Sequence, residues 1–163
     1  MKITILCVGK IKEKFYRDAI AEYEKRLSRY CKLEYIEVVD EKTPDHASAL
    51  QENQIKEKEG ERMQMRLDKL AREGTYICAL AIDGRQLDSV AFSEKLEKLG
   101  TSGISHIVFL IGGSLGMPES LLSKADLKLS FSQMTFPHQL MRVILSEQIY
   151  RAYRIMNGEP YHK

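Results

Sequence analysis

The strongest constraint on the fold is the regular alternation of short apolar runs with amphipathic segments. Each run has the length of a strand and is rich in β-branched or aromatic residues, whereas the segments between them repeat their apolar residues at helical spacing. This alternation predicts an α/β fold, with a parallel sheet and helices on both faces. The runs expected to form strands are Ile3–Val8, Leu33–Val39, Tyr76–Ile82, His106–Ile111 and Leu127–Phe131.

Helices are expected between these strands. One is predicted from Phe15 to Tyr30, and a peripheral one within the highly charged segment from His46 to Glu73, which keeps a thin apolar stripe. A shorter helix is predicted over Ser89–Leu99, with Ser89 as its N-cap. Neither a repeat nor a linker divides the chain, so residues 1–163 are expected to form one domain.

The last predicted helix, from Pro137 to Met156, is apolar on several sides and therefore needs cover on several sides. Two arrangements satisfy this equally well: a central core helix in a monomer, or a helix shared by an isologous homodimer. One apolar stripe consists of Met141, Leu145, Ile149, Ala152 and Met156, and further apolar residues are Leu140, Val143, Ile144, Tyr150, Tyr153 and Ile155.

Charge and cysteine content narrow the functional classes. The 25 basic and 23 acidic residues leave a net charge of +2, so any nucleic-acid site must be a local patch. Cys7, Cys31 and Cys78 form no C-x-x-C pair, which disfavours a metal site or catalytic thiol and suits a reducing compartment. Since no apolar run has the length of a signal peptide or a membrane span, we expect a soluble cytoplasmic protein.

The first candidate site is the segment Ile111-Gly112-Gly113-Ser114-Leu115-Gly116-Met117-Pro118. Glycines after a buried strand let a ligand or another chain segment approach the backbone, and Pro118 suits the first turn of a helix. The pattern matches neither a P-loop nor a dinucleotide fingerprint, and taken alone it favours a tight turn. It follows the fourth strand, whereas the first strand leads into one glycine and several lysines. A nucleotide-like cofactor is therefore expected near the C-terminal part of the sheet.

The second candidate is Leu129–His138, which joins the fifth strand to the last helix. Its apolar side chains, with Ser132 and Thr135, could enclose an adenine ring whose edge the backbone amides read. A structural role is also open, in which Thr135 caps the helix, Pro137 opens it and His138 is exposed. Both roles can hold for one segment.

The third candidate is the C-terminal tail, which ends in Tyr161, His162 and Lys163 after a helix that carries Arg142, Arg151 and Arg154. Tyrosine can stack on a base, cations can contact phosphates, and histidine titrates near neutral pH. The alternative is a loose, solvated tail.

Taken together, these segments resemble the small SPOUT methyltransferases that modify N3 of a pseudouridine in 23S ribosomal RNA. The similarity runs nearly from end to end. The most specific matches are Ile111-Gly112-Gly113, Met134-Thr135-Phe136-Pro137-His138-Gln139, Glu147-Gln148-Ile149-Tyr150-Arg151-Ala152 and Tyr161-His162-Lys163.

The resemblance implies a fold in which the C-terminal segment forms a trefoil knot, and it implies a homodimer that acts on the assembled ribosome. It implies S-adenosylmethionine as cofactor and no metal. Gln133 stands where the family often has lysine, so backbone contacts are expected there. The cofactor-binding residues implied are Leu80, Gly112, Phe131, Ser132, Gln133, Met134, Thr135 and Phe136.

The chemistry implied is an in-line displacement in which a base nitrogen attacks the methyl carbon of a sulfonium. The N3 proton must leave, and His162 is the candidate acceptor, with Arg142 as the second catalytic residue. It is equally open that no side chain acts as base and cations stabilise the imidate. The residues expected to contact RNA are Arg142, Arg151, Tyr161, His162 and Lys163.

Two other classes stay open. A phosphate- or flavin-binding α/β protein would explain the glycine turn, although the turn comes late in the chain. A ribosome-binding dimer without catalytic activity would keep the fold and the tail but would not bind S-adenosylmethionine.

Overall fold

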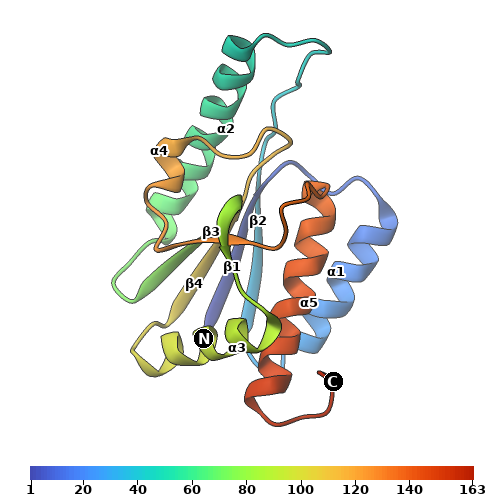
Figure 1. Ribbon diagram of the computed structural model, residues 1–163, viewed down its shortest axis with the longest axis vertical. Helices are drawn as coiled ribbons and strands as arrows, with labels where there is room; N and C mark the ends of the chain where they lie inside the picture. Colours follow the sequence, from blue (N-terminus) through green and yellow to red (C-terminus); the bar gives the residue numbers. More distant parts are fainter.

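The computed structural model describes residues 1–163. Five strands form one parallel sheet in the order β2-β1-β4-β3-β5 (Figure 1). The predicted parallel α/β class is confirmed. The elements are β1 (Lys2–Val8), α1 (Lys14–Leu27), β2 (Lys32–Val38), α2 (Ala49–Leu70), β3 (Thr75–Gln86), α3 (Ser89–Thr101), β4 (His106–Ile111), α4 (Glu119–Leu122), β5 (Leu127–Ser130) and α5 (His138–Met156).

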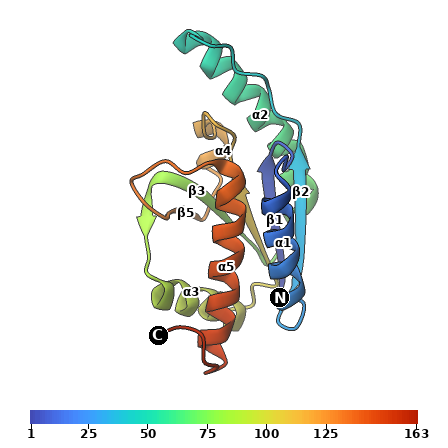
Figure 2. The ribbon, with the colours of Figure 1, turned by 90° about the vertical axis from the view of Figure 1, so that its right-hand side faces the viewer.

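Helices cover both faces of the sheet, as predicted (Figures 1 and 2). In β1, Ile3, Ile5 and Cys7 belong to a core shared with α1, α3 and α5. The alternate residues Leu6 and Val8 belong to a second core with α2 and α4. The strands are buried on both sides, which explains their continuous apolar runs.

Two local predictions are corrected. The N-cap of α3 is Asp88 rather than Ser89, because the Asp88 carboxylate accepts a hydrogen bond from the Ala91 amide at 2.7 Å. Strand β3 continues to Gln86, beyond the predicted end at Ile82. Its distal part, Arg85 and Gln86, pairs a second time with β5.

Helix α5 packs against α1, α3 and β4. Apolar residues on its remaining surface, among them Leu140, Val143 and Ile144, are half-buried in the single chain. The helix is therefore both a core element and a source of unpaired apolar surface. Its fully buried residues are Arg142, Leu145, Ser146, Ile149 and Ala152.

Helix α2 lies directly against the segment after β4. It begins with a capping box formed by Ser48 and Gln51. At Gly60, an added Cβ would lie 2.3 Å from Cγ of Pro118. The close approach of α2 to this segment therefore requires glycine.

Replacing Gly60 with Ala should destabilise the protein by about 1–3 kcal/mol, because the overpacking against Pro118 outweighs the gain in helix propensity. The free energy of unfolding, measured with urea, checks this. The matched control is Gly100→Ala in α3, where the nearest atom, Met1 Cε, is 3.4 Å from the added Cβ. That variant should stay within about 1 kcal/mol of wild type. Equal stabilities of the two variants would contradict the packing argument.

Candidate functional site

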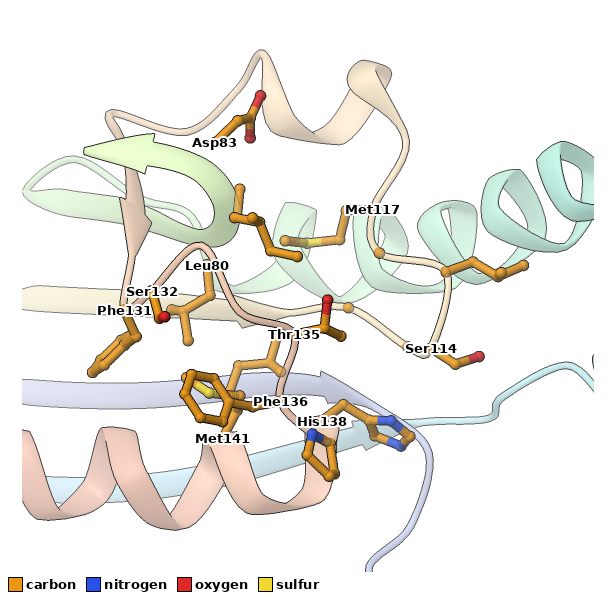
Figure 3. Close-up of a pocket in the computed structure, with 18 of the residues that line it drawn as sticks. Leu80, Asp83, Ser114, Met117, Phe131, Ser132, Thr135, Phe136, His138 and Met141 are labelled. Atoms are coloured by element: carbon orange, nitrogen blue, oxygen red, sulfur yellow. The ribbon is translucent and has the colours of Figure 1, made fainter. Parts of the chain in front are cut away.

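A cavity of about 640 Å³ opens at the carboxyl ends of β3, β4 and β5. Its size is that of a small-molecule site. Most of its walls come from Leu80–Asp83, from Ile111–Met117 and from residues between Phe131 and Met141, with Leu122 and Leu129 beside them (Figure 3). Ligands of parallel α/β proteins bind at this edge of the sheet.

The cavity brings together most of the residues that the sequence implicated in cofactor binding. Seven of those eight residues line it, and Gln133 is the exception. Gln133 is exposed on the loop, so the structure gives its side chain no place in the wall. The seven lining residues are Leu80, Gly112, Phe131, Ser132, Met134, Thr135 and Phe136.

The glycines of the β4–α4 segment are required by the turn itself. A Cβ at Gly112 would lie 2.7 Å from the carbonyl carbon of Gly116, and Gly116 has a positive φ of 82°. The tight-turn interpretation is therefore confirmed. The turn also forms one wall of the cavity, so the two interpretations describe the same segment.

The β5–α5 loop is held by its own serines. Ser130 Oγ donates to the Ser132 carbonyl at 3.1 Å, and Ser132 Oγ accepts from the Met134 amide at 3.0 Å. The predicted cap at Thr135 is wrong, since Pro137 precedes α5 and no side chain caps it. The first amides of α5 are thus left without a side-chain partner next to the cavity.

The alternative in which His138 is exposed is wrong, because His138 is half-buried and lines the cavity. Burial lowers the pKa of His138, and the positive charge of Arg142 lowers it further. A neutral imidazole therefore stands at the cavity wall at neutral pH. No local pattern in the sequence distinguishes this histidine from an exposed residue in a first helical turn.

Glu59 of α2 supports the glycine turn from the opposite side of the cavity wall. Only 4% of this residue is exposed. Its Oε1 accepts from the Glu41 amide at 3.0 Å, whereas its Oε2 has no partner and lies 2.7 Å from where a Cβ on Gly113 would be. Burial raises the pKa of Glu59, and the negative charges of Asp40 and Glu41 add to this effect.

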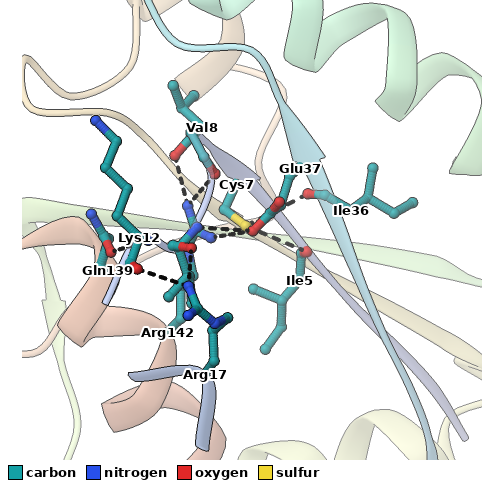
Figure 4. Close-up of polar contacts among 11 residues, drawn as sticks. Ile5, Cys7, Val8, Lys12, Arg17, Ile36, Glu37, Gln139 and Arg142 are labelled. Carbon is teal, nitrogen blue, oxygen red and sulfur yellow. Dashed lines mark hydrogen bonds and ion pairs between the residues drawn. The ribbon is translucent and has the colours of Figure 1, made fainter. Parts of the chain in front are cut away.

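Arg142, which the sequence placed in catalysis and RNA contact, is enclosed within the chain and holds structural contacts. Its side chain is 1% exposed. Nη1 donates to Glu37 Oε1 at 2.8 Å, and Nη2 donates to the carbonyls of Val8 and Gly9 at 2.7 and 2.6 Å (Figure 4). A guanidinium that is enclosed in this way has no free face for a phosphate.

The other predicted RNA residues converge at the end of α5. Arg151 Nη1 lies 3.4 Å from His162 Nδ1, and the guanidinium lies 4.7 Å from the centre of the Tyr161 ring. Tyr161 also donates to Glu147 Oε1 at 3.1 Å. The tail is thus folded onto α5 rather than loose, with His162 and Lys163 exposed.

The tail and the cavity lie at opposite ends of α5. The cavity surrounds His138, at the start of the helix, and the tail follows its last residue, Met156. The tail folds back along the helix as far as Arg151, which lies beside His162. Arg151 is roughly 20 Å along α5 from His138. Within one chain, His162 therefore does not reach the cavity.

The three cysteines are not activated as nucleophiles. Burial raises the pKa of Cys7 and Cys78 to about 12 and that of Cys31 to about 11, so all three are thiols at neutral pH. No cluster of His, Cys, Asp and Glu side chains is arranged to hold a metal ion. None of the helices has the length and apolar character that crossing a membrane requires.

Comparison with known families identifies the class of protein that has this parallel sheet and cavity. The model described as "Predicted SPOUT methyltransferase" matches residues 1–162. The chain belongs to this family of methyltransferases.

Individual relatives of this chain have a more specific name than the family. Proteins named "Ribosomal RNA large subunit methyltransferase H" from Bifidobacterium adolescentis and Clostridium tetani are 61% and 56% identical to this chain, each over 100% of both sequences. The structure of a probable methylase family protein from Haemophilus influenzae Rd KW20 has a TM-score of 0.57 at 11% identity. It covers 99% of this chain and 70% of that one, which supports the fold.

Replacing Arg142 with Ala should destabilise the protein by roughly 3 kcal/mol, because it leaves Glu37 and two strand-end carbonyls without their donor. Urea unfolding measures this effect. The control is Arg151→Ala, whose partly exposed pair with Glu147 should contribute about 1 kcal/mol or less. A fully stable Arg142→Ala protein would contradict the structural assignment.

Proposed function

We propose that this methyltransferase transfers a methyl group from S-adenosylmethionine to N3 of a pseudouridine in 23S ribosomal RNA on the assembled ribosome. The observation that carries the proposal is the cavity itself. Three separated segments meet there, in a chain whose full-length relatives bear the name of a large-subunit ribosomal RNA methyltransferase. The reaction would take place in the cytoplasm, where ribosomes are found.

The cavity suits S-adenosylmethionine. Leu80 and the apolar members of the β5–α5 loop would enclose the adenine ring, and the glycine turn with the free loop amides would bind the polar groups. When bound, this cofactor supplies an electrophilic methyl group on a sulfonium. The protein's own contribution is to hold and orient the reacting base and to exclude water.

We further propose that residues 1–163 act as one SPOUT domain with a C-terminal trefoil knot. The close crossing of β3 and β5 supports the knot. An added Cβ at Gly84 would lie 2.7 Å from the Lys128 carbonyl carbon, so the distal part of β3 passes directly over the backbone of β5.

A homodimer would complete the site. His162 lies beside Arg151, well along α5 from the cavity at His138, so a tail from the partner chain would be needed at each cavity. The unpaired apolar surface of α5 provides an interface for such a dimer. Phe15, which is 62% exposed on the first turn of α1, extends this surface, because α1 and α5 start side by side.

Within that dimer, His162 would accept the N3 proton, and Arg151, Tyr161 and Lys163 would hold the RNA. The second route is that cations stabilise the imidate and no side chain acts as base. We assign Arg142 to neither route, because both of its Nη atoms already donate within the protein.

Incubation with S-adenosylmethionine carrying a labelled methyl group, and with ribosomes from cells that lack this gene, should label a single large-subunit pseudouridine. Mass spectrometry of the RNA measures this. Cofactor binding without labelled RNA would show the substrate to be wrong. Binding to ribosomes without cofactor binding would favour the ribosome-binding dimer without catalytic activity. A yellow flavin in the purified protein would favour the flavin-binding class.

The His162→Ala variant should lose about 100-fold or more in kcat with unchanged cofactor affinity if His162 is the base. Near-normal turnover would favour the second route.

Thr135→Trp should block the cavity, because Thr135 lines it from an exposed loop. If the two variants form a mixed dimer, one cavity and one partner tail remain intact, and partial activity should return. Mixing without recovery of activity would contradict a site shared between chains.

A further inference from the structure

The loop from β1 to α1, Gly9–Glu13, lies beside the cavity and is fixed there by contacts to α5. The Lys12 amide donates to Gln139 Oε1 at 3.1 Å, and the Gly9 carbonyl accepts from Arg142 at 2.6 Å. A Cβ on Gly9 would lie 3.6 Å from Nε2 of His138, which lines the cavity. A substrate entering the cavity would therefore pass close to this loop.

The loop presents two lysines that form no ion pair, together with one exposed carboxylate, Glu13. The Lys10 and Lys12 side chains are exposed, and neither forms an ion pair with a carboxylate, whereas Lys14 pairs with Asp18 at 2.6 Å. In Figure 4 the Lys12 side chain extends away from the polar contacts around Arg142. Unpaired lysines keep their full charge available for a phosphate.

Arg17 fixes the loop from the first turns of α1. Its Nη1 donates to the carbonyls of Ile11 and Lys12 at 3.2 and 2.7 Å (Figure 4). Two carboxylates also adjoin the loop backbone. Glu37 accepts from the Ile11 amide at 3.4 Å and also pairs with Arg142. Asp40 lies against Gly9. The backbone that carries Lys10 and Lys12 is held from both α1 and α5.

Among the other segments at this edge of the sheet, the distal part of β3 has an exposed arginine, Arg85, close to an exposed carboxylate, Asp83. The remaining segments are not basic. The glycine turn and the β5–α5 segment up to Pro137 carry no charged side chain, and the β2–α2 loop has Asp40, Glu41 and Asp45 against Lys42. Since the net charge of the whole chain is only +2, a phosphate backbone needs a local positive patch. The β1–α1 loop is that patch on the cavity side.

We propose that Lys10 and Lys12 bind phosphates of the RNA that flanks the target nucleotide, on the same chain as the cavity that it enters. The inference rests on the proposed function for its substrate. It adds a docking surface that is separate from the C-terminal tail. Phosphate contacts of this kind position the nucleic acid without reading its sequence.

The test is equilibrium binding of the Lys10→Ala, Lys12→Ala double variant to unmodified ribosomes over a range of salt concentrations. Affinity at physiological salt should fall about tenfold or more, and the slope of log affinity against log salt should become shallower by about 2. S-adenosylmethionine affinity should stay within twofold of wild type. The corresponding Lys→Arg double variant should keep wild-type ribosome affinity.

The matched control is Lys25→Ala with Lys98→Ala, which removes two exposed lysines from the last turns of α1 and α3. An equal loss in this control, or no loss in the loop variant, would overturn the inference. Weaker binding with an unchanged salt slope would assign the loop to a ribosomal protein and overturn it too. Wild-type binding without methylation would refute the proposed reaction while the binding comparison still decides the role of the loop.

Discussion

The rest of the site depends on the buried contacts of Arg142. This one side chain joins α5 to the ends of β1 and β2, through two carbonyls and the Glu37 carboxylate. A guanidinium is costly to bury, so the arrangement is stable only because its Nη donors are matched. It fixes where α5 begins, and this in turn requires the preceding loop to arch over the cavity and the β1–α1 loop to lie beside it.

A second constraint comes from the opposite face of the sheet. Gly60 lets α2 contact Pro118, and the Glu59 carboxyl fills the space behind Gly113. The glycine turn is therefore held between the cavity and a helix, with little freedom to move. Burying the Glu59 carboxyl with one unpaired oxygen costs stability. The same contact holds the glycine turn in place before a ligand binds. Rigid walls lower the entropy lost when a cofactor binds.

The sequence predicted well what local pattern determines. The five strands and their parallel direction follow from periodicity. The segments around the cavity follow from glycine placement and family resemblance. Long-range packing lies beyond such reasoning. Arg142 and Arg151 stand on the same helix with similar neighbours, yet one is enclosed by strand ends and the other faces the tail. The position of His138 and the second pairing of β3 with β5 likewise depend on contacts across the whole chain.

The chain has a nearly balanced charge, yet the proposed substrate, the ribosome, is highly charged. The positions of the cations reconcile the two. Several arginines are already committed, Arg142 to strand ends, Arg154 to Glu159 and Arg62 to Glu41. Beside the cavity, the β1–α1 loop keeps two lysines free of ion pairs, and the tail adds Lys163. In the proposed dimer, a cavity would be flanked by its own loop on one side and the partner's tail on the other. Such a split would make RNA binding depend on dimer formation, because neither element alone surrounds the reacting base.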